Sequence, residues 1–504
     1  MSDPSLPARD RLADPARPAL GALVGRFLSS ASTAAIAAAV ARATGFLVFA
    51  LVARRLDQGQ ADAYALAVSY LTLFLPFSTL GLSDPITRDV ARDRSLAGAY
   101  LLNLGLFRLA SAWVCYGLLA VVAVTWFDYP VSTTRLVLWM GACLIPESLV
   151  LLLRAVFTAL ERQDVNALVA IVVSVANLGF AWWALRSGVD PIWLAGARLG
   201  SGLLGLIVGA VLAAVVVPAA WWRSLPKRPD RSWIRAMLCS SWPFTVMVVL
   251  YAVEWRADLL ILSAWSGEGQ VARYYGAQLF LLSFLMLLDA YRLAALPLFS
   301  RLVQQGSKEL GFLHDRSFWY LALIIVPISF GVSVLAKDLL ALFNPDYAAA
   351  SSTLTLLMVA LIVSALNEPN GVLMIAAGQQ RTLAALFGIS LAVNVVANVV
   401  LDRFLGGMGA AIARVLSVTA FSAVNALFVR RRIGRRFSLL KLPRVVLAGA
   451  CMGGVLLALQ AIVPWWLAGM LAGVVYLVAL LVLKGVPTDD LTVIWKHVIL
   501  QERH

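Results

Sequence analysis

The sequence predicts an all-α, polytopic membrane protein with about 14 transmembrane helices, in which two pseudo-symmetric six-helix lobes surround a central cavity and two extra helices follow. Of its 504 residues, 61% are hydrophobic and only 13% are charged, which is outside the range of soluble domains. The apolar residues form blocks of about 20 or more, the length that a hydrocarbon core of ~30 Å requires. These blocks are continuous and lack the alternation of a transmembrane barrel strand, so helices are expected.

The apolar blocks define fourteen spans. Their expected bounds are 27–53, 62–82, 98–126, 131–160, 165–186, 191–218, 236–264, 271–299, 312–336, 348–376, 381–402, 408–430, 443–463 and 465–485. Residues 1–26 precede the first span and combine prolines with charges. Because they lack the apolar core of a cleavable signal, we interpret them as a disordered cytoplasmic tail.

The distribution of positive charge orients these spans. If the N-terminus is cytoplasmic, 27 of the 41 Lys and Arg residues lie in or next to the cytoplasmic tails and loops. Only six lie on the opposite side: Arg54, Arg55, Arg186, Arg273, Lys337 and Arg403. This asymmetry follows the positive-inside rule and places both termini in the cytoplasm. The net charge of +14 therefore reflects topology, and we expect no nucleic-acid partner.

An internal repeat accounts for spans one to twelve. A basic cytoplasmic linker, 219–235, separates an N-lobe, 27–218, from a C-lobe, 236–430. The pattern G-Q-x-x-x-Y occurs at 59–64 and again at 269–274. Three further features recur at offsets between 210 and 214 residues, as in the pairs Ser29 and Ser240, Arg42 and Arg256, and Pro85 and Pro297. Two lobes related by an axis along the membrane normal are expected, although Gly, Gln and Tyr are also common at helix ends near the interface.

The last two spans lie outside the repeat. Segment 431–485 contains a strongly basic loop and spans thirteen and fourteen. The basic loop is consistent with contact to anionic lipids, and topology alone also explains it. Residues 486–504 predict a short interfacial helix with one apolar face formed by Leu491, Ile494, Trp495 and Val498.

Charged residues inside the spans are the candidate functional residues. An arginine at the bilayer centre costs about 3 kcal/mol and is read as functional by default. Five arginines have no acidic residue three or four positions away in their own helices: Arg42, Arg108, Arg154, Arg198 and Arg256. Four of them lie in the N-lobe, where Glu147 is the one acidic residue within the spans, so the net charge inside the spans of this lobe is +3. We predict that the five bind an anionic headgroup, because guanidinium groups donate paired hydrogen bonds to phosphate. Salt bridges between helices are the alternative.

Four acidic residues in the C-lobe are candidates for ion coupling: Glu254, Asp258, Asp289 and Glu368. Glu254 and Asp258 are one helical turn apart, and their crowded charge favours binding of H+ or Na+. Asp289 and Arg292 are three residues apart and can satisfy each other. The four cysteines lie in or beside separate spans without paired spacing, and no histidine relay is visible, so we expect neither a metal site nor a cofactor.

Several segments carry a resemblance to a known family. They include AAAVARATGFLVFALVARRL, GQADAYALAVSYL and GLSDPITRDVARDR in the first half. The second half contributes WPFTVMVVLYAVEWRADLLILSAW, ALPLFSRL and NEPNGVLMIAAG. Over about residues 27–430 the chain resembles polysaccharide-export flippases of the multidrug/oligosaccharidyl-lipid/polysaccharide (MOP) superfamily.

This resemblance implies a transporter, not an enzyme, in the bacterial cytoplasmic (inner) membrane. It implies that the protein flips an undecaprenyl-pyrophosphate-linked oligosaccharide from the cytoplasmic to the periplasmic leaflet by alternating access, for surface polysaccharide biosynthesis. Membrane lipids and other polysaccharide-assembly proteins are its implied partners. The residues expected to hold the pyrophosphate are Arg42, Arg154, Arg198 and Arg256, and the variants Arg42→Ala and Arg256→Ala are expected to abolish export.

Three alternatives remain open. The two extra spans are similar to those of peptidoglycan-precursor flippases of the same superfamily. A cation-coupled multidrug exporter is a second alternative, although its usual cationic cargo does not suit the +3 charge of the N-lobe. A membrane-embedded polysaccharide polymerase is the third, and it would need a catalytic loop longer than any loop predicted on the periplasmic side.

Overall fold

The computed structural model describes residues 20–188, 190–218, 231–306, 309–433, 442–460 and 462–483. Thirteen helices in this part of the chain are long and apolar enough to cross a membrane. The remaining expected span, 236–264, falls within α10 (Arg231–Trp265). The predicted all-α membrane fold is confirmed. The expected interfacial helix at 486–504 lies outside the described residues, as does most of the expected N-terminal tail; residues 20–26 are not a tail but the first turns of α1.

The first helical bundle contains eight helices. They are α1 (Leu20–Arg55), α2 (Gln58–Thr79), α3 (Ser83–Arg92), α4 (Ala97–Thr125), α5 (Val131–Ala142), α6 (Leu144–Ala159), α7 (Gln163–Arg186) and α8 (Ile192–Val216). The span expected at 131–160 is present as Val131–Ala159, with a one-residue break in the helix at Cys143 between α5 and α6. The break occurs here because Pro146 has no N–H to donate to the carbonyl of Ala142.

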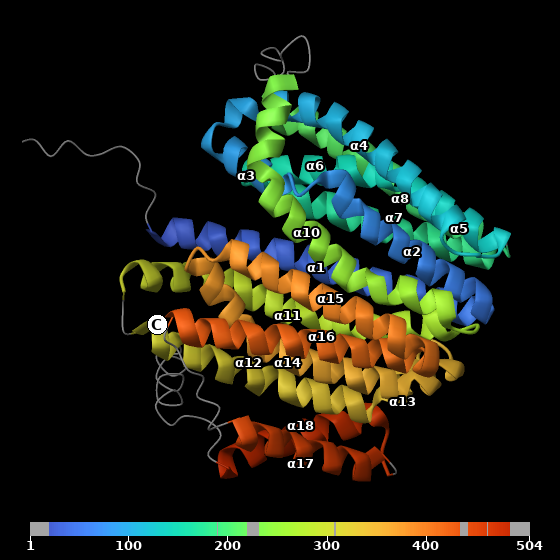
Figure 1. The fold of residues 1–504 in the computed structure, drawn as a ribbon, viewed down its shortest axis with the longest axis vertical. Coiled ribbons are helices and arrows are strands. Elements are labelled where there is room, and N and C mark those ends of the chain that lie inside the picture. The colour runs from blue at the N-terminus through green and yellow to red at the C-terminus, as the bar shows by residue number, and fades with distance from the viewer. Residues whose placement is uncertain are drawn as a thin grey trace, which may run out of the picture.

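The second bundle continues the chain. It consists of α10, α11 (Gln270–Gln304), α12 (Glu309–Val334), α13 (Ala336–Ala341), the 3-10 helix η2 (Pro345–Ala350), α14 (Ser351–Ala376), α15 (Gln380–Leu405) and α16 (Gly407–Phe428). Figure 1 shows the two bundles one above the other, with α10 running from the upper bundle to the lower one. The Thr245 hydroxyl of α10 donates to the carbonyl of Leu80 beyond α2, whereas Glu254 of α10 accepts from Ser390 of α15. α10 therefore contacts both bundles.

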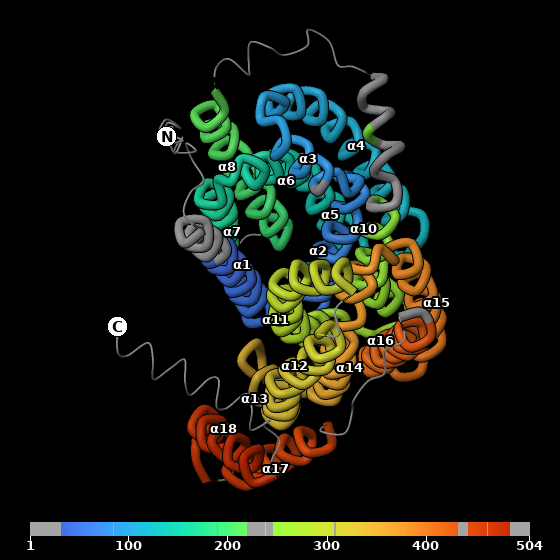
Figure 2. The backbone as a smooth tube through the Cα atoms, turned by 90° about the vertical axis from the view of Figure 1, so that its left-hand side faces the viewer, coloured from blue at the N-terminus to red at the C-terminus, as the bar shows by residue number. Residues whose placement is uncertain are grey.

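Two more helices cover the second bundle. α17 (Leu442–Gln460) and α18 (Trp465–Val482) lie on its outer side, where Figure 2 shows them next to α12. Val326 of α12 packs in one cluster with Val445 and Met452 of α17. The Tyr476 hydroxyl of α18 donates to the carbonyl of Leu323 at 2.9 Å. These contacts make α17 and α18 an addition to the second bundle.

Corresponding helices in the two bundles end in the same way, as an internal repeat predicts. α6 and α14 are each followed by a residue with positive φ, Glu161 (61°) and Gly378 (72°). In both cases this residue donates its N–H three residues back at 3.1 Å, and the next residue donates its N–H five residues back at 2.9 Å. The sequence A-R-x-x-S also recurs, and the serines Ser201 and Ser417 each donate to the carbonyl of the arginine three residues before. The pseudo-symmetric lobes are confirmed.

The two bundles are joined firmly at one end, which we call the closed end: the end at which α1 finishes. Phe49 of α1 packs against Tyr275 and Phe343 of the second bundle, with ring centroids 4.9 and 5.2 Å apart. The guanidinium of Arg54 donates to the carbonyl of Leu342 at 2.6 Å. The Asp62 carboxylate of α2 accepts from two backbone N–H groups at the start of α11, those of residues 269 and 272. An aromatic core and polar contacts together seal this end.

Candidate functional site

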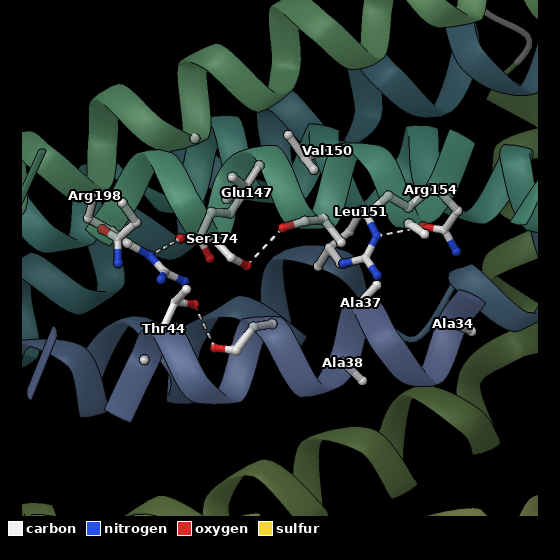
Figure 3. A pocket seen from close by; sticks show the side chains of 18 of the residues that line it. Ala34, Ala37, Ala38, Thr44, Glu147, Val150, Leu151, Arg154, Ser174 and Arg198 are labelled. Carbon is white, nitrogen blue, oxygen red and sulfur yellow. Dashed lines mark hydrogen bonds and ion pairs between the residues drawn. The ribbon is translucent and has the colours of Figure 1, made fainter. Parts of the chain in front are cut away.

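A pocket of about 330 Å³, here called the N-lobe pocket, lies between α1, α6, α7 and α8. Its α1 wall consists of small residues at helical spacing: Ala34, Ala37, Ala38, Ala41 and Gly45. The opposite wall carries Glu147 and Arg154 of α6 and Arg198 of α8 (Figure 3). Because α1 presents little side-chain volume here, the space in front of the charged residues stays open.

The charges of the N-lobe pocket do not cancel. Arg198 pairs with Glu147 at 2.6 Å. Arg154 donates from Nε to the side-chain oxygen of Asn166 at 2.7 Å, and no carboxylate among the described residues lies within 4 Å of it. It follows Glu147 by seven residues, about 10 Å along α6, and Figure 3 shows it towards the opposite end from Arg198. The net charge of +1 in this pocket therefore belongs to Arg154.

A second pocket of about 440 Å³, the C-lobe pocket, lies between α10, α11, α14, α15 and α16. Arg292 pairs with Glu368 at 2.7 Å and with Asp289 at 3.6 Å. The contact that the sequence predicted between Asp289 and Arg292 is therefore present, and Glu368 adds a stronger one. Tyr251 and Phe387 line the apolar part of the wall. The charged residues of this pocket give a net charge of −1.

Helix α1 separates the two pockets. Ala41 faces the N-lobe pocket, whereas the guanidinium of Arg42 reaches Asp289 of the C-lobe pocket at 3.7 Å. Both side chains are substantially exposed, at 35% and 55%, so this pair adds little stability. In the sequence analysis, Arg42 contributed to the net charge of +3 assigned to the N-lobe. The structure leaves a charge of +1 in the N-lobe pocket, because Arg42 faces the other pocket and Arg108 faces neither. Once Arg42 is counted there, the charges of the C-lobe pocket cancel: Arg42 and Arg292 stand against Asp289 and Glu368.

Arg108 is fully buried in the first bundle. Its Nη1 donates to the carbonyl of Ser148 at 2.9 Å, and its Nη2 donates to the hydroxyl of Ser83 at 3.1 Å. These contacts join α3, α4 and α6, a structural role with no access to either pocket. The structure does not bring Arg108 together with the other predicted arginines.

Arg256 is half-buried on α10 and donates to Gln278 of α11 at 3.4 Å. It lies nine residues before the end of α10, whereas Arg42 lies thirteen residues before the end of α1. The difference of four residues is about 6 Å along a helix. The two arginines are therefore at different depths and are not the symmetric counterparts that the repeat suggested.

The predicted ion-coupling acids lie in two adjoining places. Asp289 and Glu368 line the C-lobe pocket and share a smaller pocket of about 90 Å³ with Glu254. Glu254 and Asp258 are themselves buried, in a cluster with α16. There Arg414 donates to Asp258 and to the backbone carbonyl of Glu254, both at 2.7 Å. Arg414 is itself buried, at 1% exposed. One arginine thus faces two acids inside the second bundle.

Asp402 is a further member of this cluster that sequence reasoning missed. It is 2% exposed, and neither carboxylate oxygen has a hydrogen-bond partner in the described structure. It was not singled out from the sequence. The spacing of polar residues could have identified it. Ser390, Asn394, Asn398 and Asp402 are four residues apart and form one buried stripe on α15.

The geometry of a tight helix hairpin places Asp402 in the cluster. Gly406 between α15 and α16 has φ of +55°, and a Cβ at Gly409 would lie 2.5 Å from the backbone oxygen of Leu401. Only glycine fits both positions, so the two helices can turn back closely. Asp402 lies within electrostatic reach of Asp258, so Glu254, Asp258, Asp402 and Arg414 together carry a formal charge of −2. Such a charge is costly inside a bundle unless a proton or cation neutralises it.

The part of the chain that the structure describes contains no group of three or more His, Cys, Asp or Glu side chains placed to hold a metal ion. The three acids of the cluster therefore do not converge on one point.

Comparisons with known proteins agree with this architecture. A family model described as "Polysaccharide biosynthesis protein" matches residues 27–303. A curated relative from Haloferax volcanii, "Probable low-salt glycan biosynthesis flippase Agl15", is 23% identical over 284 residues, which cover 54% of this chain. The match spans 59% of that relative, somewhat less than two thirds of its length.

Solved structures share the fold. The structure described as "Lipid II flippase MurJ, inward closed conformation" superposes with a TM-score of 0.70 at 14% identity, covering 88% of this chain and 97% of that one. An inward-facing multidrug resistance MATE family transporter of the MOP superfamily gives 0.64 at 14% identity, covering 80% and 98%. At this level of identity the likeness shows a common fold of two helical bundles.

Proposed function

Because the chain belongs to the polysaccharide biosynthesis protein family and has the fold of MOP superfamily transporters, we propose that it flips a lipid-linked glycan across the membrane. The expectation of a transporter rather than an enzyme agrees with this family and fold. The proposed cargo is an undecaprenyl-pyrophosphate-linked oligosaccharide for surface polysaccharide biosynthesis. Its chemistry comprises an anionic diphosphate, a large polar glycan and a long apolar chain.

Arg154 is the observation that carries this proposal. It is a cation without a carboxylate partner among the described residues, and it faces an open pocket at membrane depth. A guanidinium group in this setting is stabilised by two parallel hydrogen bonds to a phosphate. Water molecules in a narrow pocket replace these two bonds less well. In this account the diphosphate binds at Arg154 in the N-lobe pocket, and Arg198 adds a second guanidinium if its contact with Glu147 opens.

Alternating access requires the closed end to open. The positive-inside rule places this end on the periplasmic side of a bacterial inner membrane, with both termini in the cytoplasm. The described conformation would then receive cargo from the cytoplasm. Release requires the contacts of Arg54, Asp62 and Phe49 across the bundles to separate.

The Asp62 contact gives a direct prediction. The variant Asp62→Asn is expected to weaken the closed end by about 2 kcal/mol, because the carboxylate accepts two charge-assisted bonds from α11 and an amide replaces one oxygen with a donor. Cysteines introduced at Gln58 and Asp346, whose side chains are hydrogen-bonded across the bundles, report closure by disulfide yield. The yield should fall several-fold in Asp62→Asn and stay unchanged in the control Asp128→Asn, an exposed acid between α4 and α5. An unchanged yield in Asp62→Asn would contradict the role given to this contact.

The buried acid cluster supports coupling of transport to a proton. Asp402 and one oxygen of Glu254 have no hydrogen-bond partner in the described structure, and Arg414 forms its one ion pair with Asp258. A proton on Asp402 would remove the cost of an unpaired buried charge. Because α10 contacts both bundles, loss of that proton can change how α10 packs against α15. Sodium is the alternative coupling ion.

A binding experiment tests the proposed cargo. Purified protein in nanodiscs should bind a fluorescent polyprenyl-diphosphate oligosaccharide at least tenfold more tightly than the same chain without phosphate, a neutral polyprenol. Equal affinity for the two lipids would refute recognition of the anionic headgroup.

A cation exporter is the second candidate function, favoured by the C-lobe pocket. This pocket has two carboxylates, Asp289 and Glu368, and an aromatic wall with Tyr251, Phe387 and Phe421, which suits an organic cation. Efflux of ethidium from cells that express the protein would support this candidate, and the lipid-binding experiment separates it from the first.

A further inference from the structure

The outer surface of the closed end carries an apolar groove of about 590 Å³, here called the seam groove. Its walls come from the last turns of α1, with Leu51, and of α7, with Val175 and Trp182. Leu342 of the second bundle closes one side, so the groove lies across the seam between the bundles. Phe46 forms the floor, because its ring packs against Phe343 at 4.6 Å and against Phe280 at 5.1 Å.

Three arginines lie at the ends of the two helices that form this groove. Arg54 lines it, Arg55 follows in sequence, and the guanidinium of Arg186 lies 5.2 Å above the ring of Trp182. All three are exposed, and in the described part of the chain none has a carboxylate within 4 Å. They make up half of the six Lys and Arg residues on this side of the membrane, where the positive-inside rule disfavours basic residues. Membrane topology therefore does not explain why these arginines lie close to one apolar groove.

We propose that the seam groove binds an anionic phospholipid of the leaflet at the closed end. One acyl chain occupies the apolar walls, and the headgroup phosphate contacts Arg54 and Arg186. The aromatic floor separates the groove from the interior of the bundles, so the lipid enters from the surrounding membrane and not from the transport pockets. Charge complementarity selects an anionic headgroup, because exposed arginines near the surface attract anionic lipids.

The proposed lipid has a mechanical consequence. Its chain would touch α1 and α7 on one side and Leu342 on the other, and these groups separate when the closed end opens. A bound lipid therefore stabilises the described conformation. Lipid binding can be measured without transport, so this inference stands apart from the proposed function.

Photo-crosslinking tests the proposal. Full-length protein in nanodiscs is labelled with phosphatidylglycerol or phosphatidylcholine that carries a diazirine on one acyl chain. Peptides from α1 and α7 should be labelled about tenfold more by phosphatidylglycerol, and the double variant Arg54→Gln/Arg186→Gln should remove this preference. The matched control is Arg403→Gln, because Arg403 also stacks over a tryptophan at this end, Trp265, at 5.5 Å, but does not line the groove.

A second variant tests the apolar part without touching a charge. Gly179 lines the groove, and a Cβ there would meet nothing within 4 Å, so Gly179→Leu fills the groove without a clash. It should reduce labelling at least fivefold, whereas Gly117→Leu, at another open glycine on α4, should not. Equal labelling by the two lipids, or full labelling of Gly179→Leu, would overturn the proposal. Labelling by a polyprenyl phosphate that phosphatidylglycerol fails to compete would equally overturn it and assign the groove to cargo.

Discussion

Arg154→Gln is expected to reduce binding of the polyprenyl-diphosphate oligosaccharide by about 30- to 150-fold. The physical reason is the loss of charge-assisted hydrogen bonds to phosphate, worth about 2–3 kcal/mol where the cation has no other partner. Arg154→Lys should fall between the variant and the wild type, because lysine keeps the charge but loses the planar fork. Affinity in nanodiscs and the amount of surface polymer in cells both measure this effect.

The control for Arg154 is Arg301→Gln, an exposed arginine near the end of α11 that should leave affinity unchanged. Folding is checked by size-exclusion profile and thermal stability, which should change little because Arg154 makes a single side-chain hydrogen bond with Asn166. If Arg154→Gln folds normally and binds the cargo as tightly as the wild type, the N-lobe pocket is not the headgroup site.

Asp402→Asn is expected to abolish the dependence of transport on a pH gradient and to lower its rate at least tenfold. The amide imitates a permanently protonated carboxyl group, so the cluster around Arg414 can no longer exchange a proton. Flipping in proteoliposomes, with and without an imposed gradient, measures the effect.

Two results would count against the Asp402 account. Retention of the full gradient dependence in Asp402→Asn would show that the proton binds elsewhere. A requirement for sodium that a pH gradient cannot replace would assign the cluster to Na+ instead. Asp128→Asn again serves as the control, because this acid is exposed and lies outside the bundles' interior.

The fold could be predicted from the sequence because membrane helices follow from local composition. Apolar length and charge asymmetry gave the spans, and spaced motifs gave the repeat that the helix ends at Glu161 and Gly378 confirm. The span expected at 131–160 is present, but the one-residue break within it at Cys143 could not be predicted, since a proline there leaves the hydropathy pattern of the span unchanged. Residues 20–26 were assigned to a tail because their apolar run is short, although α1 begins there.

The candidate site could be predicted only in part, because pairing across helices depends on packing. All five arginines lacked an acidic neighbour in their own helices, yet Arg198 pairs with Glu147, Arg42 reaches Asp289, and Arg108 is held by backbone and hydroxyl groups. The sequence did not distinguish Arg154 from Arg42. In the structure Arg154 faces the N-lobe pocket, whereas Arg42 reaches Asp289 of the C-lobe pocket. Arg154 is therefore the arginine whose substitution tests headgroup binding most directly, in place of Arg42.

The most direct test of the proposed function is flipping by the purified protein. Proteoliposomes are prepared with a fluorescent polyprenyl-diphosphate oligosaccharide, and the fraction protected from a membrane-impermeant quencher is followed over time. The account predicts that the wild type moves the lipid between leaflets and that Arg154→Gln does so at less than a tenth of that rate. Absence of flipping by the wild type, in vesicles where the same protein exports an organic cation, would contradict it.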